Sequence, residues 1–226
     1  MPIGFQSYSP CISTRSTHMK VSLIGTGKMG TGLAAVMAAA GHEVTLGARD
    51  ITKASMLAAS LGRGITGTDI ETASQCSEVV ILALPYGAVA EVLSQTDGLA
   101  GKVVVDISNP ITADFQDLLL GHSTSAAEEI QKLLPKARVV KAFNTIFSNL
   151  LETSARQDKT LQVFIAGDDA DAKATVAELA RTARFEPVES GPLRNSRFIE
   201  PIGEMNIHFG FFLGRGVGIA PAWVQV

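Results

Sequence analysis

Residues 21–30 of the chain, VSLIGTGKMG, decide the fold. The first four, Val21-Ser22-Leu23-Ile24, have the composition of a short β-strand, and the alanine-rich segment from Met29 to Ala40 has strong helix propensity. The residues that join the two, Gly25-Thr26-Gly27-Lys28-Met29-Gly30, fit the pattern G-x-G-x-x-G. Between a strand and a helix, this pattern is typical of a dinucleotide-binding fold.

Each glycine of this turn has a separate physical task. Gly25 permits the tight turn, Gly27 lets the backbone approach a pyrophosphate, and Gly30 lets the helix pack against the strand. The helix N-terminus then offers free N–H groups and a positive dipole end to the phosphates. A glycine turn without a ligand is the alternative. A nucleoside-triphosphate P-loop does not fit, because Met29 follows Lys28 where that motif needs Ser or Thr.

Strand and helix signals alternate along the rest of the chain. Val79–Leu84 is a continuous apolar run, typical of a buried parallel strand. Further strands are predicted at Glu43–Leu46, Ile65–Thr66, Lys102–Asp106, Arg138–Lys141, Gln162–Ala166 and Glu186–Val188, and helices at Thr52–Leu61, Val89–Leu93, Ala126–Leu134 and from the Asp169 cap to Ala183. This alternation predicts an α/β fold: a Rossmann-like, doubly wound, mostly parallel sheet with a small C-terminal helical extension.

The end of the second predicted strand decides between NAD and NADP. NAD sites usually carry an acid there, which bonds the ribose 2′-hydroxyl. Here the strand runs into Gly47-Ala48-Arg49, and the Arg49 guanidinium is suited to clamp a 2′-phosphate. Lys53, one helical turn further on, adds positive charge. NADP is therefore predicted, held by Ala48, Arg49 and Lys53, while Asp50 keeps NAD open as the alternative.

The chain is predicted to divide into three segments. Residues 19–150 form the NADP-binding Rossmann domain. Residues 151–226 add a strand-helix-strand unit and helices that complete the sheet and line the substrate pocket. Residues 1–18 hold no acid and no apolar core of a signal peptide, and Met19-Lys20 leads directly into a strand. We interpret residues 1–18 as a disordered extension or a misplaced start.

The carboxyl ends of the predicted strands mark a crevice, where ligands of open α/β sheets bind. Leu84 and Pro85 are predicted to flank the nicotinamide or its ribose. Asn109 and Asn144 are predicted to bond the carboxamide or a second ring. The alternative for each asparagine is a turn-forming residue that local backbone satisfies. With Gly25, Thr26, Gly27, Lys28, Met29 and Gly30, these four complete the predicted cofactor-binding set.

No catalytic acid or base is predicted. None of His18, His42, His122 and His208 stands at the carboxyl end of a strand, and Asp106, within a strand, is interpreted as structural. Reduction of a ketone or imine benefits from a proton donor. Hydride exchange between two stacked redox rings proceeds mainly through positioning. The sequence therefore favours the ring-to-ring reaction.

The C-terminal segment carries an apolar stripe at helical spacing: Phe198, Ile202, Met205, Phe209 and Phe212. It is interpreted either as core packing or a dimer contact, or as the roof of a ligand pocket. A homodimer would cover these side chains.

Composition bounds the function classes. A net charge of −3 gives no basic face for nucleic acid, and no apolar run is long enough to span a membrane. The two cysteines, Cys11 and Cys76, are predicted to be free thiols, and no metal-ligand spacing is present. The expected partner is a small redox molecule, in the cytoplasm.

Four strings resemble the NADPH-dependent deazaflavin (coenzyme F420) reductases and the cytoplasmic oxidoreductase domain of the six-transmembrane metalloreductases. They are residues 21–30, Gly47-Ala48-Arg49, VDISNP at 105–110 and VKAFNT at 140–145, joined by Gly167-Asp168 and the closing APAW at 220–223. The resemblance implies NADP on the glycine turn and on Ala48-Arg49, a flavin-like ring over the nicotinamide near the C-terminal helices, and hydride transfer from one ring to the other. The family often has Ser where Ala48 stands, so one bond to the 2′-phosphate is missing.

The leading hypothesis is an NADPH-linked oxidoreductase that acts on a deazaflavin (F420) or a flavin, a flavin-reductase type of activity. An NADPH-dependent reductase of imines or keto acids, of the pyrroline-carboxylate reductase or hydroxyacid dehydrogenase type, is the second. A non-catalytic NADP(H)-binding module is the third.

Overall fold

The structure is a computed structural model that describes residues 18–226. The hypotheses for residues 1–17, including the free thiol of Cys11, therefore lie outside the described residues. The strands are β1 (Lys20–Ile24), β2 (Glu43–Gly47), β3 (Thr66–Thr68), β4 (Val79–Leu82), β5 (Val103–Asp106), β6 (Arg138–Lys141), β7 (Gln162–Gly167) and β8 (Glu186–Glu189). The helices are α1 (Lys28–Ala39), α2 (Ile51–Leu61), α3 (Ile70–Cys76), α4 (Tyr86–Leu93), α5 (Ala126–Leu133), α6 (Ala170–Thr182) and α7 (Ser196–Ile207). Short 3₁₀ turns are η1 (Ser148–Leu150), η2 (Thr153–Arg156) and η3 (Leu193–Asn195), and a π-helical turn, η4 (His208–Phe212), extends α7.

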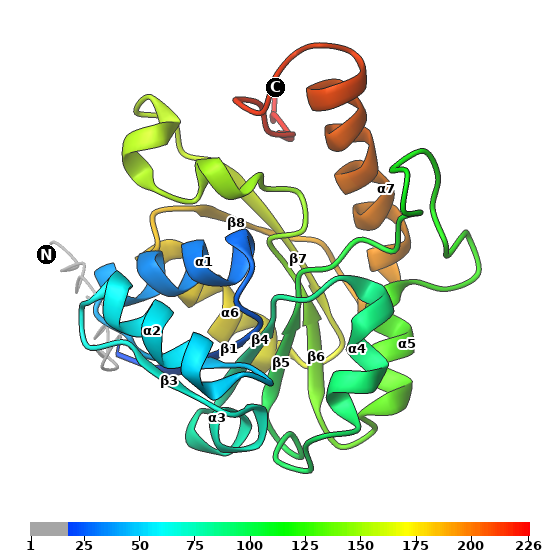
Figure 1. Cartoon of the computed structure of the whole chain (residues 1–226). Helices are drawn as coiled ribbons and strands as arrows, with labels where there is room; N and C mark the ends of the chain where they lie inside the picture. Colours follow the sequence, from blue (N-terminus) through cyan, green and yellow to red (C-terminus); the bar gives the residue numbers. More distant parts are fainter. Residues whose placement is uncertain (1–17) are drawn as a thin grey trace, which may run out of the picture.

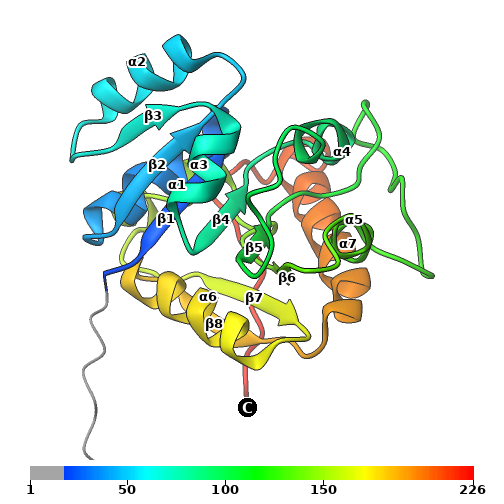
Figure 2. The same cartoon turned by 90° about the horizontal axis from the view of Figure 1, so that it is seen from below.

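One sheet of eight strands forms the centre of the molecule, in the order β3-β2-β1-β4-β5-β6-β7-β8 (Figure 2). The strands from β3 to β6 are parallel, and the order reverses between β1 and β4. This reversal is the switch point at which open α/β sheets bind their ligands. The predicted Rossmann-like fold is confirmed.

Helices cover both faces of the sheet, because its strands are apolar on both sides. On β4, Val79 and Ile81 join the core cluster under α1 and α6, while Val80 and Leu82 join the cluster under α3, α4 and α5. A parallel strand buried on both faces reads as an unbroken apolar run. That is the pattern by which β4 was predicted from sequence.

Two features of the fold were not predicted from the sequence. Strand β7 runs antiparallel to β6, and β8 then runs parallel to β7. An antiparallel pair needs no crossover helix, and the link from β6 to β7 contains only η1 and η2. Helix α3 was not predicted, and Cys76 is its last residue. It begins at Asp69, whose carboxylate accepts a hydrogen bond from Thr72 N.

Helix α7 and its π-helical turn extend beyond the sheet, and the C-terminal segment folds back beside them (Figure 1). The apolar stripe lies on this unit, but Phe198, Met205 and Phe212 are 65%, 45% and 47% exposed. The interpretation as core packing is therefore wrong for these three side chains, and the homodimer stays a prediction. Within residues 18–226, no helix is both long enough and apolar enough to cross a lipid bilayer.

Candidate functional site

The glycine turn has the geometry that its sequence predicts. Gly25 has φ +119°, and a Cβ there would lie 2.3 Å from Ala83 O. A Cβ on Gly30 would lie 2.1 Å from Gly25 O, so this glycine lets α1 pack against the turn. A Cβ on Gly27 would meet nothing within 4 Å. The space at Gly27 is thus open to a ligand, while Gly25 and Gly30 are fixed by packing.

The N-terminus of α1 lies at this open space. Gly27 is its cap residue and provides no side-chain hydrogen bond. Helices α2, α3, α5 and α6 differ in this respect, because each has an N-cap side chain that accepts a hydrogen bond from a backbone N–H of the first turn. These cap residues are Asp50, Asp69, Ser125 and Asp169. The first N–H groups of any helix have no partner inside it. At α1 they fit an anionic group such as a pyrophosphate.

Arg49 follows directly after β2, as predicted. Its Nη1 lies 3.0 Å from Glu91 Oε1 on α4, and both side chains are exposed. Ala48 N donates to Thr68 O at 3.1 Å, which anchors the loop to the end of β3. Asp50 accepts a hydrogen bond from Lys53 N at 3.0 Å and so caps α2. The Asp50 carboxylate, which would bind a ribose hydroxyl in an NAD site, therefore caps α2 instead. Arg49 is held by a surface ion pair.

Leu84 and Pro85 follow β4 and border the glycine turn. Leu84 Cδ2 would lie 3.2 Å from a Cβ on Gly25, and Pro85 begins α4. Because β4 is the neighbour of β1 in the sheet, the two strand ends meet at the switch point. The structure thus brings both residues to the predicted nucleotide crevice.

Asn109 and Asn144 bond to each other across the ends of β5 and β6. Asn144 Nδ2 donates to Asn109 Oδ1 at 2.9 Å, and Asn109 Nδ2 donates to Asn144 O at 3.0 Å. Asn144 Nδ2 also reaches Ile199 O on α7 at 3.2 Å. The side-chain oxygen of Asn144 is buried and has no hydrogen-bond partner among the described residues. The two amides therefore connect α7 to the sheet, and one buried acceptor, Asn144 Oδ1, stays without a partner.

A buried ion group that was not predicted from the sequence lies on β5, β6 and α7, close to the asparagine pair. Lys141 Nζ donates to Asp106 Oδ2 at 2.7 Å, Ser108 O at 2.6 Å and Glu200 Oε1 at 2.8 Å. Burial alone would lower the pKa of Lys141, but the two carboxylates outweigh it and raise that pKa. Asp106 is structural, as predicted. Glu200 also accepts from Ala126 N at the start of α5, so it joins α5 and α7 to the sheet.

A crevice of about 250 Å³ opens between the strand ends and α7. Its lining includes Met29 of the glycine turn, the two asparagines, and aromatic side chains from three separate segments. The rings of Phe147 and Phe211 pack edge to face, with 5.7 Å between their centroids. Phe115, which has φ +60°, comes from the loop after β5. The remaining lining residues are Ile107, Phe143, Thr145, Ile146, Ser148, Gly203, Asn206 and Ile207. None of these described lining residues titrates near neutral pH.

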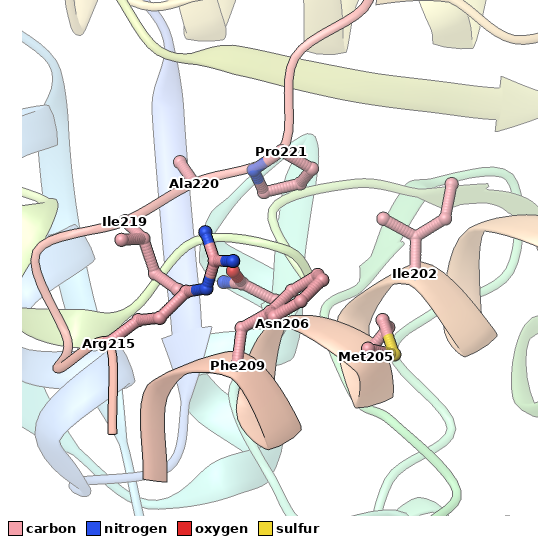
Figure 3. A pocket seen from close by; sticks show the side chains of 8 residues that line it. All are labelled: Ile202, Met205, Asn206, Phe209, Arg215, Ile219, Ala220 and Pro221. Carbon is pink, nitrogen blue, oxygen red and sulfur yellow. The ribbon is translucent and has the colours of Figure 1, made fainter. Parts of the chain in front are cut away.

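A second cavity, of about 360 Å³, lies on the other side of Asn206 (Figure 3). Ile202 and Met205 of α7 and Phe209 of η4 form one wall, and the returning segment at Ile219–Pro221 forms the opposite wall. Arg215 stands at one end, its guanidinium 5.0 Å from the centre of the Phe209 ring. Part of the predicted stripe therefore lines a pocket, and Asn206 borders both cavities.

Glu204 and His208 form a pair on α7, at a spacing that a helix brings together. His208 Nε2 lies 3.2 Å from Glu204 Oε1, and burial raises the pKa of Glu204. Neither side chain lines the crevice, although their neighbours Gly203 and Ile207 do. The i, i+4 spacing was visible in the sequence, but only the fold shows that Glu204 is buried.

Comparison with known proteins places these features in a family context. Residues 20–110 match the family model described as NADP oxidoreductase coenzyme F420-dependent. The metalloreductase STEAP3 of Rattus norvegicus is 36% identical over 183 residues, which cover 81% of this chain and 36% of that protein. The F420-dependent NADP reductase of Methanothermobacter thermautotrophicus is 35% identical over 210 residues, which cover 84% of this chain and 88% of that protein.

A solved structure from Arthrobacter sp. FB24, which carries the provisional name F420-dependent NADP reductase, superposes with a TM-score of 0.81. It is 28% identical to this chain, and the alignment covers 92% of this chain and 100% of that one. The chain thus spans about a third of the metalloreductase's length, but nearly the full length of the reductases.

Proposed function

This chain belongs to the family of F420-dependent NADP oxidoreductases, and we propose that it transfers a hydride between NADP(H) and a deazaflavin or flavin bound in the crevice. The proposal has three parts: a nucleotide site at the glycine turn, a phosphate reader at Arg49, and a ring site beside Asn109 and Asn144. Each part is supported by separate observations.

The nucleotide site is supported by the uncapped N-terminus of α1. Open space at Gly27 and unpaired N–H groups at the start of α1 suit a pyrophosphate. Beyond β2, Arg49 would receive the 2′-phosphate, and Lys53 would add positive charge from the first turn of α2. Leu84 and Pro85 would then flank the nicotinamide half. When bound, the nicotinamide supplies or accepts the hydride.

The choice of reaction depends on one observation: the described lining of the crevice holds no group that titrates near neutral pH. Reduction of a carbonyl or imine needs a proton at the reacting centre, and a positioned side chain usually supplies it. Hydride exchange between two aromatic rings instead depends on their alignment. The aromatic side chains Phe115, Phe147 and Phe211 favour a flat ring.

The preference for NADP is tested by Arg49→Ala. We expect this variant to raise KM for NADPH by roughly ten-fold or more, because a charge-assisted bidentate contact is lost. KM for NADH should change far less, since NADH has no 2′-phosphate. Equal effects on both nucleotides would contradict the role of Arg49.

The second substrate is tested by NADPH oxidation with a panel of F420, FMN, FAD and riboflavin. Steady oxidation of NADPH with one of these rings supports the proposal. Oxidation only with cyclic imines or keto acids would contradict it and favour the second hypothesis. Tight NADPH binding without turnover of any compound would favour a non-catalytic module.

A further inference from the structure

The ion pair between Arg49 and Glu91 crosses the end of a strand to which neither residue belongs. Arg49 follows β2, and Glu91 lies on α4, which follows β4. Strand β1 lies between β2 and β4 in the sheet. A contact of 3.0 Å between Arg49 Nη1 and Glu91 Oε1 therefore spans the carboxyl end of β1, beside the glycine turn.

In the proposed NADP site, this position would lie on the path of the adenosine half of the nucleotide. If the pyrophosphate lies at the glycine turn and the 2′-phosphate at Arg49, the adenosine must lie between them, bordered by α4. In the free protein, Glu91 forms an ion pair with the Arg49 guanidinium, which is the group that the phosphate would bind. A phosphate within bonding distance of Arg49 would also stand a few ångströms from the Glu91 carboxylate, and two like charges that close repel each other.

We infer that Glu91 sets the strength of 2′-phosphate recognition, by holding Arg49 in the free protein and competing with the phosphate for it. The inference rests on the proposed NADP site. Both side chains are about two-thirds exposed, at 67% and 64%, so water and salt screen their attraction. The pair therefore opens readily, and Glu91 weakens phosphate binding moderately without preventing it.

The test is calorimetric titration with adenosine 2′,5′-bisphosphate, which carries the 2′-phosphate, and with adenosine 5′-monophosphate, which does not. We expect Glu91→Gln to lower Kd for the bisphosphate about two- to five-fold, the range expected for an exposed ion pair, and to leave Kd for the monophosphate unchanged. High salt should reduce the difference in Kd for the bisphosphate between wild type and Glu91→Gln, because salt screens the charges. In an Arg49→Ala background, Glu91→Gln should have a smaller effect on Kd for the bisphosphate, because the competition for Arg49 is gone and only the direct repulsion between the carboxylate and the phosphate remains.

The matched control is Glu43→Gln. Glu43 is also an exposed partner in an ion pair, with Lys20 at 3.5 Å, but lies at the opposite end of β2. Its substitution should leave both titrations unchanged. An unchanged or weaker affinity of Glu91→Gln for the bisphosphate overturns the inference, as does equal tightening for both nucleotides. If wild type binds neither the bisphosphate nor NADPH, the proposed function fails together with it.

Discussion

Lys141 Nζ lies 2.8 Å from Glu200 Oε1, and this contact joins α7 to the centre of the sheet. The ammonium donates three hydrogen bonds, to Asp106, Ser108 and Glu200, so each of its protons has an acceptor. Both side chains are almost fully buried. Helix α7, which lines the crevice, is thus held by an ion pair between two residues that are 59 positions apart in the sequence.

Removing the ammonium should therefore destabilise the fold strongly. Lys141→Met leaves the Asp106 and Glu200 carboxylates buried without their cation, and breaking a buried pair in this way costs about 3–5 kcal/mol. The free energy of unfolding, measured in urea, should fall by that amount. Lys20→Met removes one member of the exposed pair with Glu43 and should cost about 0–1 kcal/mol. Equal losses in the two variants would show that the buried group contributes little.

The sequence predicts those features of the fold whose pattern lies within a short stretch of the chain. The apolar run of β4 and the glycine turn each carry their signal within ten residues, and the structure places both as predicted. Helix α3 was missed because its seven residues contain too few apolar positions to show a helical period. The antiparallel direction of β7 has no local signal either, since strand direction depends on the connection and not on composition.

The site contacts depend on which strands become neighbours. Asn109 and Asn144 were both predicted to lie at strand ends, but their mutual hydrogen bonds require β5 and β6 to be adjacent. The partners of Lys141 and Arg49 depend on the fold in the same way. A lysine in an apolar strand is nevertheless a sequence signal, because a buried ammonium needs a carboxylate partner. Lys141 within the run 138–143 could have been flagged on that ground.

A pH dependence of stability is expected from His42, which is buried near the amino ends of the strands. Its Nδ1 accepts a hydrogen bond from Met19 N at 3.2 Å, and its Nε2 lies 2.8 Å from Thr182 Oγ1. Burial lowers the pKa of His42, the nearby His18 lowers it further, and Glu178 opposes them. The folded protein therefore binds this proton less readily than the unfolded chain does.

The sign follows from proton linkage. Below the unfolded pKa of about 6.5 the unfolded chain takes up the proton first, so stability is lost as pH falls from there through the folded pKa. His42→Asn, which keeps an acceptor for Met19 N, should lose less unfolding free energy between pH 7.5 and 5.5 than wild type. His122→Asn changes an exposed histidine and should follow the wild-type curve. If the free energy of unfolding falls equally with pH in wild type and His42→Asn, His42 is not the source of the pH dependence.

The glycine turn allows binding and folding to be separated by two neighbouring substitutions. A Cβ on Gly27 meets no protein atom within 4 Å, so Gly27→Ala should leave the free energy of unfolding nearly unchanged. The methyl group would instead stand where a pyrophosphate approaches the backbone, and Kd for NADP(H) should rise roughly ten-fold or more. Gly30→Ala should cost about 1–3 kcal/mol of stability, because its Cβ would lie 2.1 Å from Gly25 O.

Gly87→Ala is the matched control, since a Cβ on this glycine of α4 also meets nothing within 4 Å. It should bind NADP(H) as wild type does and be slightly more stable, by about 0.5–1 kcal/mol, because alanine favours a helix. Calorimetric titration and urea unfolding on the same preparations give both quantities. If Gly27→Ala binds NADP(H) with wild-type affinity, the pyrophosphate does not approach the backbone at Gly27, and the open space there has another cause. If Gly27→Ala loses as much free energy of unfolding as Gly30→Ala, Gly27 is required for the fold rather than for the ligand.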